Sequence, residues 1–167
     1  MDTLVSERLT ASPRIFHAFG LCGIASLSEF AMQGSIEDEI YGYDDEEKGE
    51  GWKLNMAEKA IPTNDLSIIE KLEYALQIAE AVADLHGYAD GLILHLDLKQ
   101  DQFFWNRDKS MIKLNDFSRA TFLMWDDSKQ EYCPCDENEY RRVRKRLFLC
   151  LICQLSKLAH IFHLFML

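Results

Sequence analysis

The chain has 167 residues, and 48% of them are hydrophobic, which is enough for the core of one globular domain. Its formal net charge is −10 and its isoelectric point is near 4.9. This acidity argues against nucleic acid as the main partner, because phosphate backbones bind basic surfaces. Five cysteines, an odd number, argue against a disulfide framework. No apolar leader with a basic flank opens the sequence, so a cytoplasmic setting is expected.

Two β-prone segments come first, at residues 12–20 and 25–31. Each carries aromatic or aliphatic side chains in short runs, and Gly20 and Gly23 mark a turn between them. We therefore expect two neighbouring strands here.

An acidic stretch follows at residues 37–50, where tyrosine and glycine are mixed with carboxylates. It predicts a solvated loop within an insertion that spans residues 37–62. As an alternative, these carboxylates could recruit basic segments of a substrate.

Residues 66–87 predict an amphipathic helix. Apolar side chains recur at three- and four-residue steps and so share one face, namely Leu66, Ile69, Leu72, Leu76, Ala79 and Val82. The candidate caps are Asn64 or Asp65, the capping-box pair Ser67 and Glu70, and Gly87 at the end.

Two polar loops each follow a short apolar run that predicts a strand, at residues 92–94 and 112–114. The first loop, residues 95–104, reads His-Leu-Asp-Leu-Lys-Gln-Asp-Gln-Phe-Phe, and the second, residues 116–118, reads Asp-Phe-Ser. Taken alone, these polar residues could be ordinary turn residues beside short strands.

The C-terminal segment is basic at residues 141–146 and apolar at residues 147–167. Three interpretations stay open. The apolar run could span a membrane, although Lys157 near its middle would cost about 2.5 to 3.5 kcal/mol. It could instead form a basic amphipathic helix at an interface or in a partner groove. Finally, it could come from a shifted frame or unspliced region that replaces the natural ending.

In order and residue type, the two polar loops resemble the catalytic loop and the metal-binding loop of protein kinases. The resemblance implies that Asp97 accepts the proton of the attacking hydroxyl and that Lys99 sits against the moving phosphate of ATP. Gln102 and Asp116 would hold Mg²⁺. Lys99 also indicates the serine/threonine-specific type.

The resemblance extends upstream. The segments at 12–20 and 25–31 look like the last two strands of a kinase small lobe running into its hinge. This implies that backbone groups of Glu29 and Ala31 bind the adenine edge, and that Ser28 guards the pocket behind it. Residues after 32 then resemble the turn into the next short helix.

The sequence also departs from the family pattern. Leu96 replaces an arginine, Gln102 an asparagine and Ser118 a glycine. The glycine-rich phosphate loop, the strand lysine and the Ala-Pro-Glu anchor of the family have no counterpart in the sequence. Because the lysine's ion pair is needed for activity, we expect this chain to be weak or inactive alone. A large lobe without its later helices would also leave the apolar face of the 66–87 helix partly uncovered.

We therefore expect an α+β, protein-kinase-like fold, comprising the end of the small lobe and the first half of the large lobe, with an apolar C-terminal helix. The expected divisions are the small-lobe end and hinge, the inserted loop, the start of the large lobe and the tail, at residues 1–36, 37–62, 63–140 and 141–167. The implied function is ATP- and Mg²⁺-dependent phosphoryl transfer to serine or threonine hydroxyls of a protein substrate. The alternative is a non-catalytic, pseudokinase-like module that binds a protein partner and is tethered to a membrane through residues 147–167.

Overall fold

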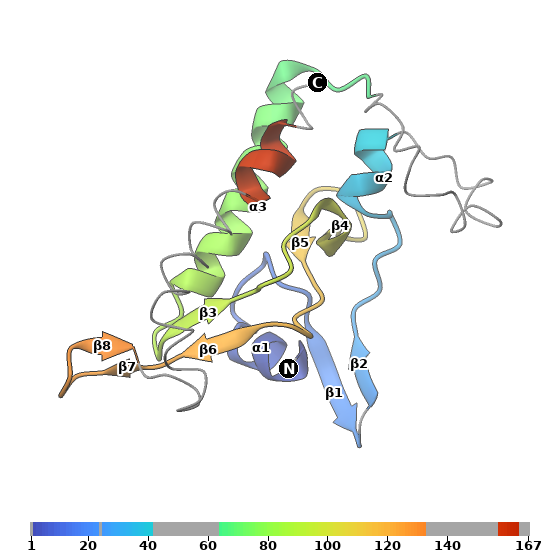
Figure 1. Ribbon diagram of the computed structural model, residues 1–167. Helices are drawn as coiled ribbons and strands as arrows, with labels where there is room; N and C mark the ends of the chain where they lie inside the picture. The colour runs from blue at the N-terminus through green and yellow to red at the C-terminus, as the bar shows by residue number, and fades with distance from the viewer. Residues whose placement is uncertain (1, 24, 42–63, 133–156, 164–167) are drawn as a thin grey trace, which may run out of the picture.

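The computed structural model describes residues 2–23, 25–41, 64–132 and 157–163 (Figure 1). These residues form helices and short antiparallel strands, in agreement with the α+β class expected from the sequence. The strands among them pair into four two-stranded sheets. Most of the predicted insertion, the basic cluster and the first part of the apolar tail lie outside the described residues.

A buried hairpin forms the centre of the domain. Strands β4 (Phe103–Trp105) and β5 (Ile112–Leu114) pair antiparallel, with Phe103 opposite Leu114. The strand predicted at residues 112–114 is therefore confirmed. Phe103, Ile112 and Leu114 have no solvent exposure, so the removal of their apolar surface from water stabilises this hairpin.

Two other segments extend the pairing of this hairpin. Ile15 forms a parallel bridge with Leu114, and Ser35 forms an antiparallel bridge with Phe104. The chain before and after the predicted hinge is thus attached to the two edges of the buried hairpin.

Helix α3 (Ile68–His86) contacts β5 and β3 (Leu92–Leu94). The predicted capping box is present at its start: the Ser67 hydroxyl accepts a hydrogen bond from the Glu70 backbone, and the Glu70 side chain accepts one from the Ser67 backbone. Gly87 ends the helix, as predicted.

Helix α3 leaves one apolar stripe uncovered by the described residues. Ile69, Leu72 and Leu76 are 65%, 59% and 60% exposed. The buried side chains of the helix are instead Tyr74, Ile78, Ala81, Val82 and Leu85. The expectation of a partly uncovered face is therefore confirmed, because the strands cover α3 from one side only.

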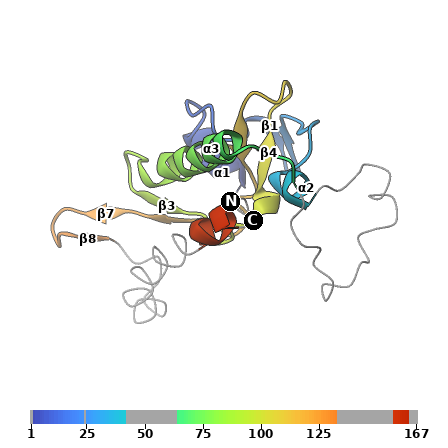
Figure 2. The ribbon, with the colours of Figure 1, turned by 90° about the horizontal axis from the view of Figure 1, so that it is seen from above.

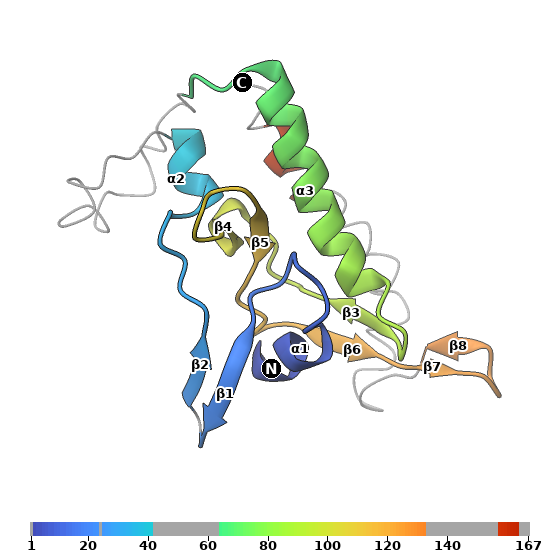
Figure 3. The same cartoon turned by 180° about the vertical axis from the view of Figure 1, so that it is seen from behind.

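Helix α1 (Asp2–Arg8) contacts β1 (Ala18–Cys22), which pairs antiparallel with β2 (Ala25–Ser28). Both strands are shorter than the segments predicted at 12–20 and 25–31. Nearly all of their side chains are exposed, and the hairpin projects away from α3 (Figure 3).

Helix α2 (Ile36–Tyr41) occupies the start of the segment that we expected to be a solvated loop. Glu39 accepts a hydrogen bond from the Trp105 indole nitrogen at 2.9 Å and pairs with Lys109 at 3.0 Å. The loop prediction is therefore wrong for residues 37–41, whose acidic side chains surround a buried apolar face. The short helix after the turn is confirmed.

The remaining described elements surround the predicted catalytic loop. Strand β3, also predicted from the sequence, pairs antiparallel with β6 (Thr121–Leu123). The 3-10 helix η3 (Gln100–Gln102) leads into β4, and β7 (Trp125–Asp126) pairs with β8 (Glu131–Tyr132).

A short helical segment at residues 157–163 lies alongside α3 (Figures 1 and 2). Its Leu158 and Ile161 are buried in the main core cluster, together with side chains of α3 and the β4–β5 hairpin. No helix among the described residues has both the length and the apolar character needed to cross a membrane.

Candidate functional site

The two predicted loops are tied together by a buried histidine. His95 follows β3 and has no solvent exposure; its Nε2 lies 3.0 Å from the carbonyl oxygen of Asn115, and its Nδ1 accepts a hydrogen bond from the Asp97 backbone at 3.3 Å. A carbonyl can only accept, so the proton resides on Nε2 and the ring is neutral. Burial lowers the pKa of His95, which favours the same state.

The β4–β5 hairpin brings the predicted metal ligands close to each other. Register places Gln102 opposite Asn115, whose backbone nitrogen donates to the Gln102 carbonyl oxygen at 3.0 Å. Asp116 is the next residue along the chain. The two residues predicted to hold Mg²⁺ therefore occupy neighbouring positions at one end of the hairpin.

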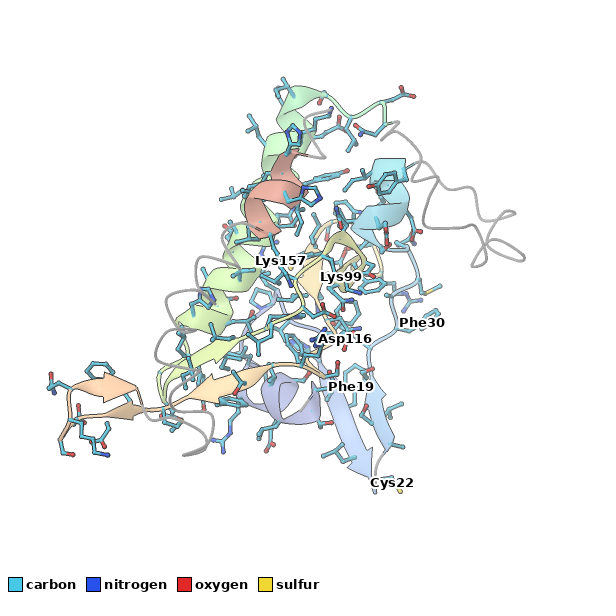
Figure 4. All side chains as sticks on the ribbon, in the orientation of Figure 1. Phe19, Cys22, Phe30, Lys99, Asp116 and Lys157 are labelled. Carbon is cyan, nitrogen blue, oxygen red and sulfur yellow. The ribbon has the colours of Figure 1, made fainter. Side chains whose placement is uncertain are left out.

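Lys99 forms ion pairs with two carboxylates of its own loop. Its Nζ lies 2.9 Å from Oδ2 of Asp101 and 3.9 Å from Oδ2 of Asp97. The hydrogen bond to Asp101 raises the pKa of Lys99, and the charges of Asp97 and Asp116 act in the same direction. In the view of Figure 4, Lys99 and Asp116 both lie in the central part of the molecule. Lys99 is therefore close to two carboxylates of its own loop, and the charge of Asp116 in the second loop also acts on it.

Both loops contain backbone strain. Leu96 has φ of 65° and Asp116 has φ of 55°, in the left-handed region that side chains other than glycine seldom adopt. The other two non-glycine residues with such a φ among those described, Lys109 and Gln130, are in turns. Strain of this kind costs about 1–3 kcal/mol and is typical of functional loops. Here one strained residue, Leu96, immediately precedes the predicted catalytic carboxylate of Asp97, and the other is Asp116, the predicted metal ligand.

Ser118, which replaces the family's glycine, contributes to this site. Its backbone nitrogen donates to Oδ1 of Asp116 at 3.3 Å. Hydrogen bonding by the Ser118 side chain is the main reason that the pKa of Asp116 lies below its usual value, while partial burial opposes the shift. The carboxylate of Asp116 is therefore kept ionised, which is the state that binds a cation.

The donor set is suited to magnesium. Mg²⁺ prefers oxygen ligands and usually takes one or two carboxylates, with the rest of its shell supplied by phosphate and water. Asp116 offers a carboxylate, and Gln102 offers an amide oxygen that receives no hydrogen bond from any described residue. The Gln102 amide nitrogen donates to Asp101 at 2.9 Å, which fixes the orientation of this side chain. Among the described residues, no group of three or more His, Cys, Asp or Glu side chains is placed to hold a metal ion by itself.

A cavity lies beside Asp116 and Ser28. Its volume is about 290 Å³, near the lower end of the range for small-molecule sites. Side chains from α1, the β1–β2 hairpin and the second loop line it, among them Ser28, Asn115 and Asp116. Ser28, predicted to guard a pocket, and Asp116, predicted to hold a metal, thus face the same space.

The predicted hinge residues Glu29 and Ala31 follow Ser28, which lines this cavity, and neither of them is among the lining residues. No described residue hydrogen-bonds the carbonyl of Glu29 or the backbone groups of Ala31. The backbone nitrogen of Glu29 donates to His17 at 3.0 Å, so this segment is held in place from its other side.

The structure adds residues that sequence reasoning missed. Arg119 places Nη1 3.6 Å from Oδ1 of Asp97, and Lys157 donates to the carbonyl oxygen of Leu96 at 3.4 Å. Lys113 of β5 pairs with the Glu29 carboxylate. The sequence could have indicated only Arg119, because it is a cation three residues after Asp116. The pairing of Lys157 with Leu96 and that of Lys113 with Glu29 each join residues more than sixty positions apart.

The chain matches no known protein-family model, and no curated protein matches it. Its fold and the geometry of this site therefore carry the functional argument.

Proposed function

We propose that this chain is a protein-kinase-like domain that binds Mg²⁺ and ATP between residues 29–31 and the loops that carry Asp97 and Asp116. The observation that carries the proposal is that Lys99 lies 3.9 Å from Asp97 and is within reach of the charge of Asp116, while Asp116 and Ser28 line one cavity. The sequence alone had placed these residues in one site through the resemblance to kinases.

The roles of the residues follow from their positions. The Asp97 carboxylate has Lys99 at 3.9 Å and Arg119 at 3.6 Å, and it would accept the proton of a serine or threonine hydroxyl. Lys99 is held by Asp101 in the described structure and would exchange this contact for a phosphate oxygen. Asp116 and Gln102 would hold Mg²⁺, which would supply positive charge to neutralise the phosphates.

Activity of the chain alone should be weak. The sequence supplies neither a glycine-rich phosphate loop nor the strand lysine. Phosphoryl transfer depends mainly on positioning and charge neutralisation, so the loss of these two parts removes phosphate contacts and leaves the proton acceptor in place.

Nucleotide binding is tested by thermal unfolding of the full chain with ATP, with and without Mg²⁺. A ligand that binds only the folded state raises the melting temperature as its concentration rises. We expect Mg²⁺-ATP to raise it more than ATP alone, and we expect Asp116→Asn to abolish that difference. Asp108→Asn, the same change at an exposed turn of the β4–β5 hairpin, should preserve it. The absence of any shift at millimolar nucleotide would contradict the proposal.

Catalysis is tested separately, by transfer of labelled γ-phosphate to a generic basic protein. We expect slow transfer that is lost in Asp97→Asn and retained in Asp108→Asn. Binding without transfer in the unmodified chain would instead establish the second candidate, a pseudokinase-like binding module.

One observation favours this second candidate. Asp101 binds the Lys99 ammonium at 2.9 Å, so it competes with a phosphate group for the cation that the chemistry requires. Asp101→Asn discriminates between the candidates, because transfer should rise if this competition limits catalysis and stay absent in a pure binding module.

A further inference from the structure

A largely buried ion pair joins the predicted hinge to the strand that leads to Asp116. Nζ of Lys113 lies 2.6 Å from Oε1 of Glu29, and the two side chains are only 9% and 25% exposed. The partners are 84 positions apart in the sequence. Lys113 precedes Asp116 by three residues, and Glu29 opens the segment expected to bind adenine.

Backbone hydrogen bonds run parallel to this ion pair. The Phe16 nitrogen donates to Leu114 of β5 at 3.1 Å, and the Glu29 nitrogen donates to His17 at 3.0 Å. The Glu29 carboxylate also accepts from the His17 nitrogen at 3.2 Å. A strand-like segment at residues 14–17 therefore lies between β5 and residue 29, and the lysine side chain reaches across it.

The lysine crosses at a wall of the cavity. Its ammonium lies 5.8 Å from the centroid of the Phe16 ring, and Phe16 lines the cavity together with Ser28 and Asp116. A change in the ion pair would therefore alter the positions of residues at both ends of the proposed nucleotide site.

We infer that Lys113 and Glu29 form a positioning pair, which holds the adenine-binding backbone at a fixed distance from the metal-binding loop. This inference rests on the proposed function, since it assigns a role within the same site. Neither side chain needs to touch the nucleotide: the pair acts through the backbone of residues 29–31 and through the Phe16 wall.

The physical reason lies in the burial of the pair. Removing one partner leaves the other charge buried and unpaired, which is more costly than replacing both by neutral groups. The unpaired side chain would move toward water and pull its segment with it. If only a fraction of molecules then keeps the binding conformation, the apparent dissociation constant rises by the inverse of that fraction.

The experiment compares Lys113→Met, Glu29→Gln and the double variant by calorimetric titration with adenosine, which lacks phosphates and reports on the hinge alone. Glu29→Gln keeps the backbone carbonyl expected to meet the adenine. We expect each single variant to raise the dissociation constant for adenosine about tenfold, which corresponds to about one tenth of the molecules keeping the binding conformation. The double variant should lose no more than either single variant. Lys109→Met is the control, because Lys109 belongs to the same hairpin region and also pairs with a glutamate. This variant should retain full affinity for adenosine.

Hydrogen exchange of the Glu29 amide provides a readout without ligand. Its protection should fall in both single variants, recover in the double variant and stay unchanged in Lys109→Met. Equal adenosine affinity in all folded variants, or losses that add in the double variant, would overturn the positioning role while the proposed function stands. Failure of the unmodified chain to bind adenosine would overturn both.

Discussion

The hairpins β4–β5 and β1–β2 have similar lengths and the same antiparallel pairing, but they are held in different ways. In β4–β5, the side chains of Phe103, Ile112 and Leu114 are fully buried. In β1–β2, Phe19, Leu21 and Leu27 are 67%, 61% and 67% exposed. A two-stranded hairpin alone is only marginally stable in water, so burial and not strand pairing secures the first one.

The exposed hairpin is connected to the buried one mainly through polar contacts. Glu29, directly after β2, bonds to His17 and to Lys113, and Phe16 bonds to β5 through its backbone. The cavity of the proposed site lies at this junction, lined by residues of α1, of the β1–β2 hairpin and of the loop that follows β5. The comparison shows that the loop with the acidic residue Asp116 follows a hairpin that burial holds in place. The exposed β1–β2 hairpin, on the other side of the cavity, is fixed by a small number of hydrogen bonds and one ion pair.

The largest expected effect comes from the buried hairpin. Phe103→Ala should lower the free energy of unfolding by about 3–5 kcal/mol, because it removes buried apolar surface and leaves a cavity. Phe19→Ala makes the same change in the exposed hairpin and should cost less than about 0.5 kcal/mol. Urea unfolding followed by circular dichroism measures both. Equal losses would show that the exposed hairpin is buried in solution.

The second effect tests the polar contact that attaches helix α2 to the buried hairpin. Glu39 accepts the indole hydrogen bond of Trp105, whose side chain is almost fully buried. Glu39→Ala leaves this donor without its partner, so the free energy of unfolding should fall by about 1–3 kcal/mol. Glu73→Ala, the same change at an exposed position of helix α3, is the control and should be near neutral. The comparison fails if both variants unfold at the same urea concentration.

Local signals in the sequence predicted part of this fold. The Ser67 and Glu70 capping box and the strands at 92–94 and 112–114 depend on neighbouring residues, and the structure contains them. The turn into a short helix was also predicted, but the carboxylates around Glu39 gave the false expectation of a solvated loop, since their apolar neighbours are few.

Other features depend on tertiary contacts that no local pattern shows. The spacing of Ile69, Leu72 and Leu76 shows that they share a face, while the position of β5 decides which face of α3 is covered. For the site, order and residue type proposed Asp97, Lys99 and Asp116; the structure places Asp97 3.9 Å from Lys99, and the shared role of the three stays a prediction. The pair of Lys113 with Glu29 joins two residues that each look like ordinary surface charges in the sequence.

The third prediction concerns pH and the loop at the end of the buried hairpin. Burial lowers the pKa of His95 below its ordinary value of 6.5, so below about pH 6.5 the unfolded chain binds a proton that the folded chain resists. The stabilising contribution is therefore present above this pH and is lost as the pH falls toward the folded pKa. His95→Gln keeps a donor for Asn115 and should flatten the dependence of unfolding free energy on pH between 6.5 and 5, by less than about 1.4 kcal/mol per pH unit. An unchanged slope would mean that His95 is charged in the folded chain.

The smallest expected effect returns to the exposed hairpin. Leu27 lies opposite Gly20 in the β1–β2 register and is mostly exposed, so Leu27→Thr removes little buried surface and keeps a residue suited to strands. The free energy of unfolding should change by less than about 0.5 kcal/mol. Exposed apolar groups favour association, however, so light scattering at increasing protein concentration should show less self-association in the variant than in the unmodified chain. If the free energy of unfolding fell by more than about 1 kcal/mol, Leu27 would have to be buried in solution. The contrast between the two hairpins would then disappear.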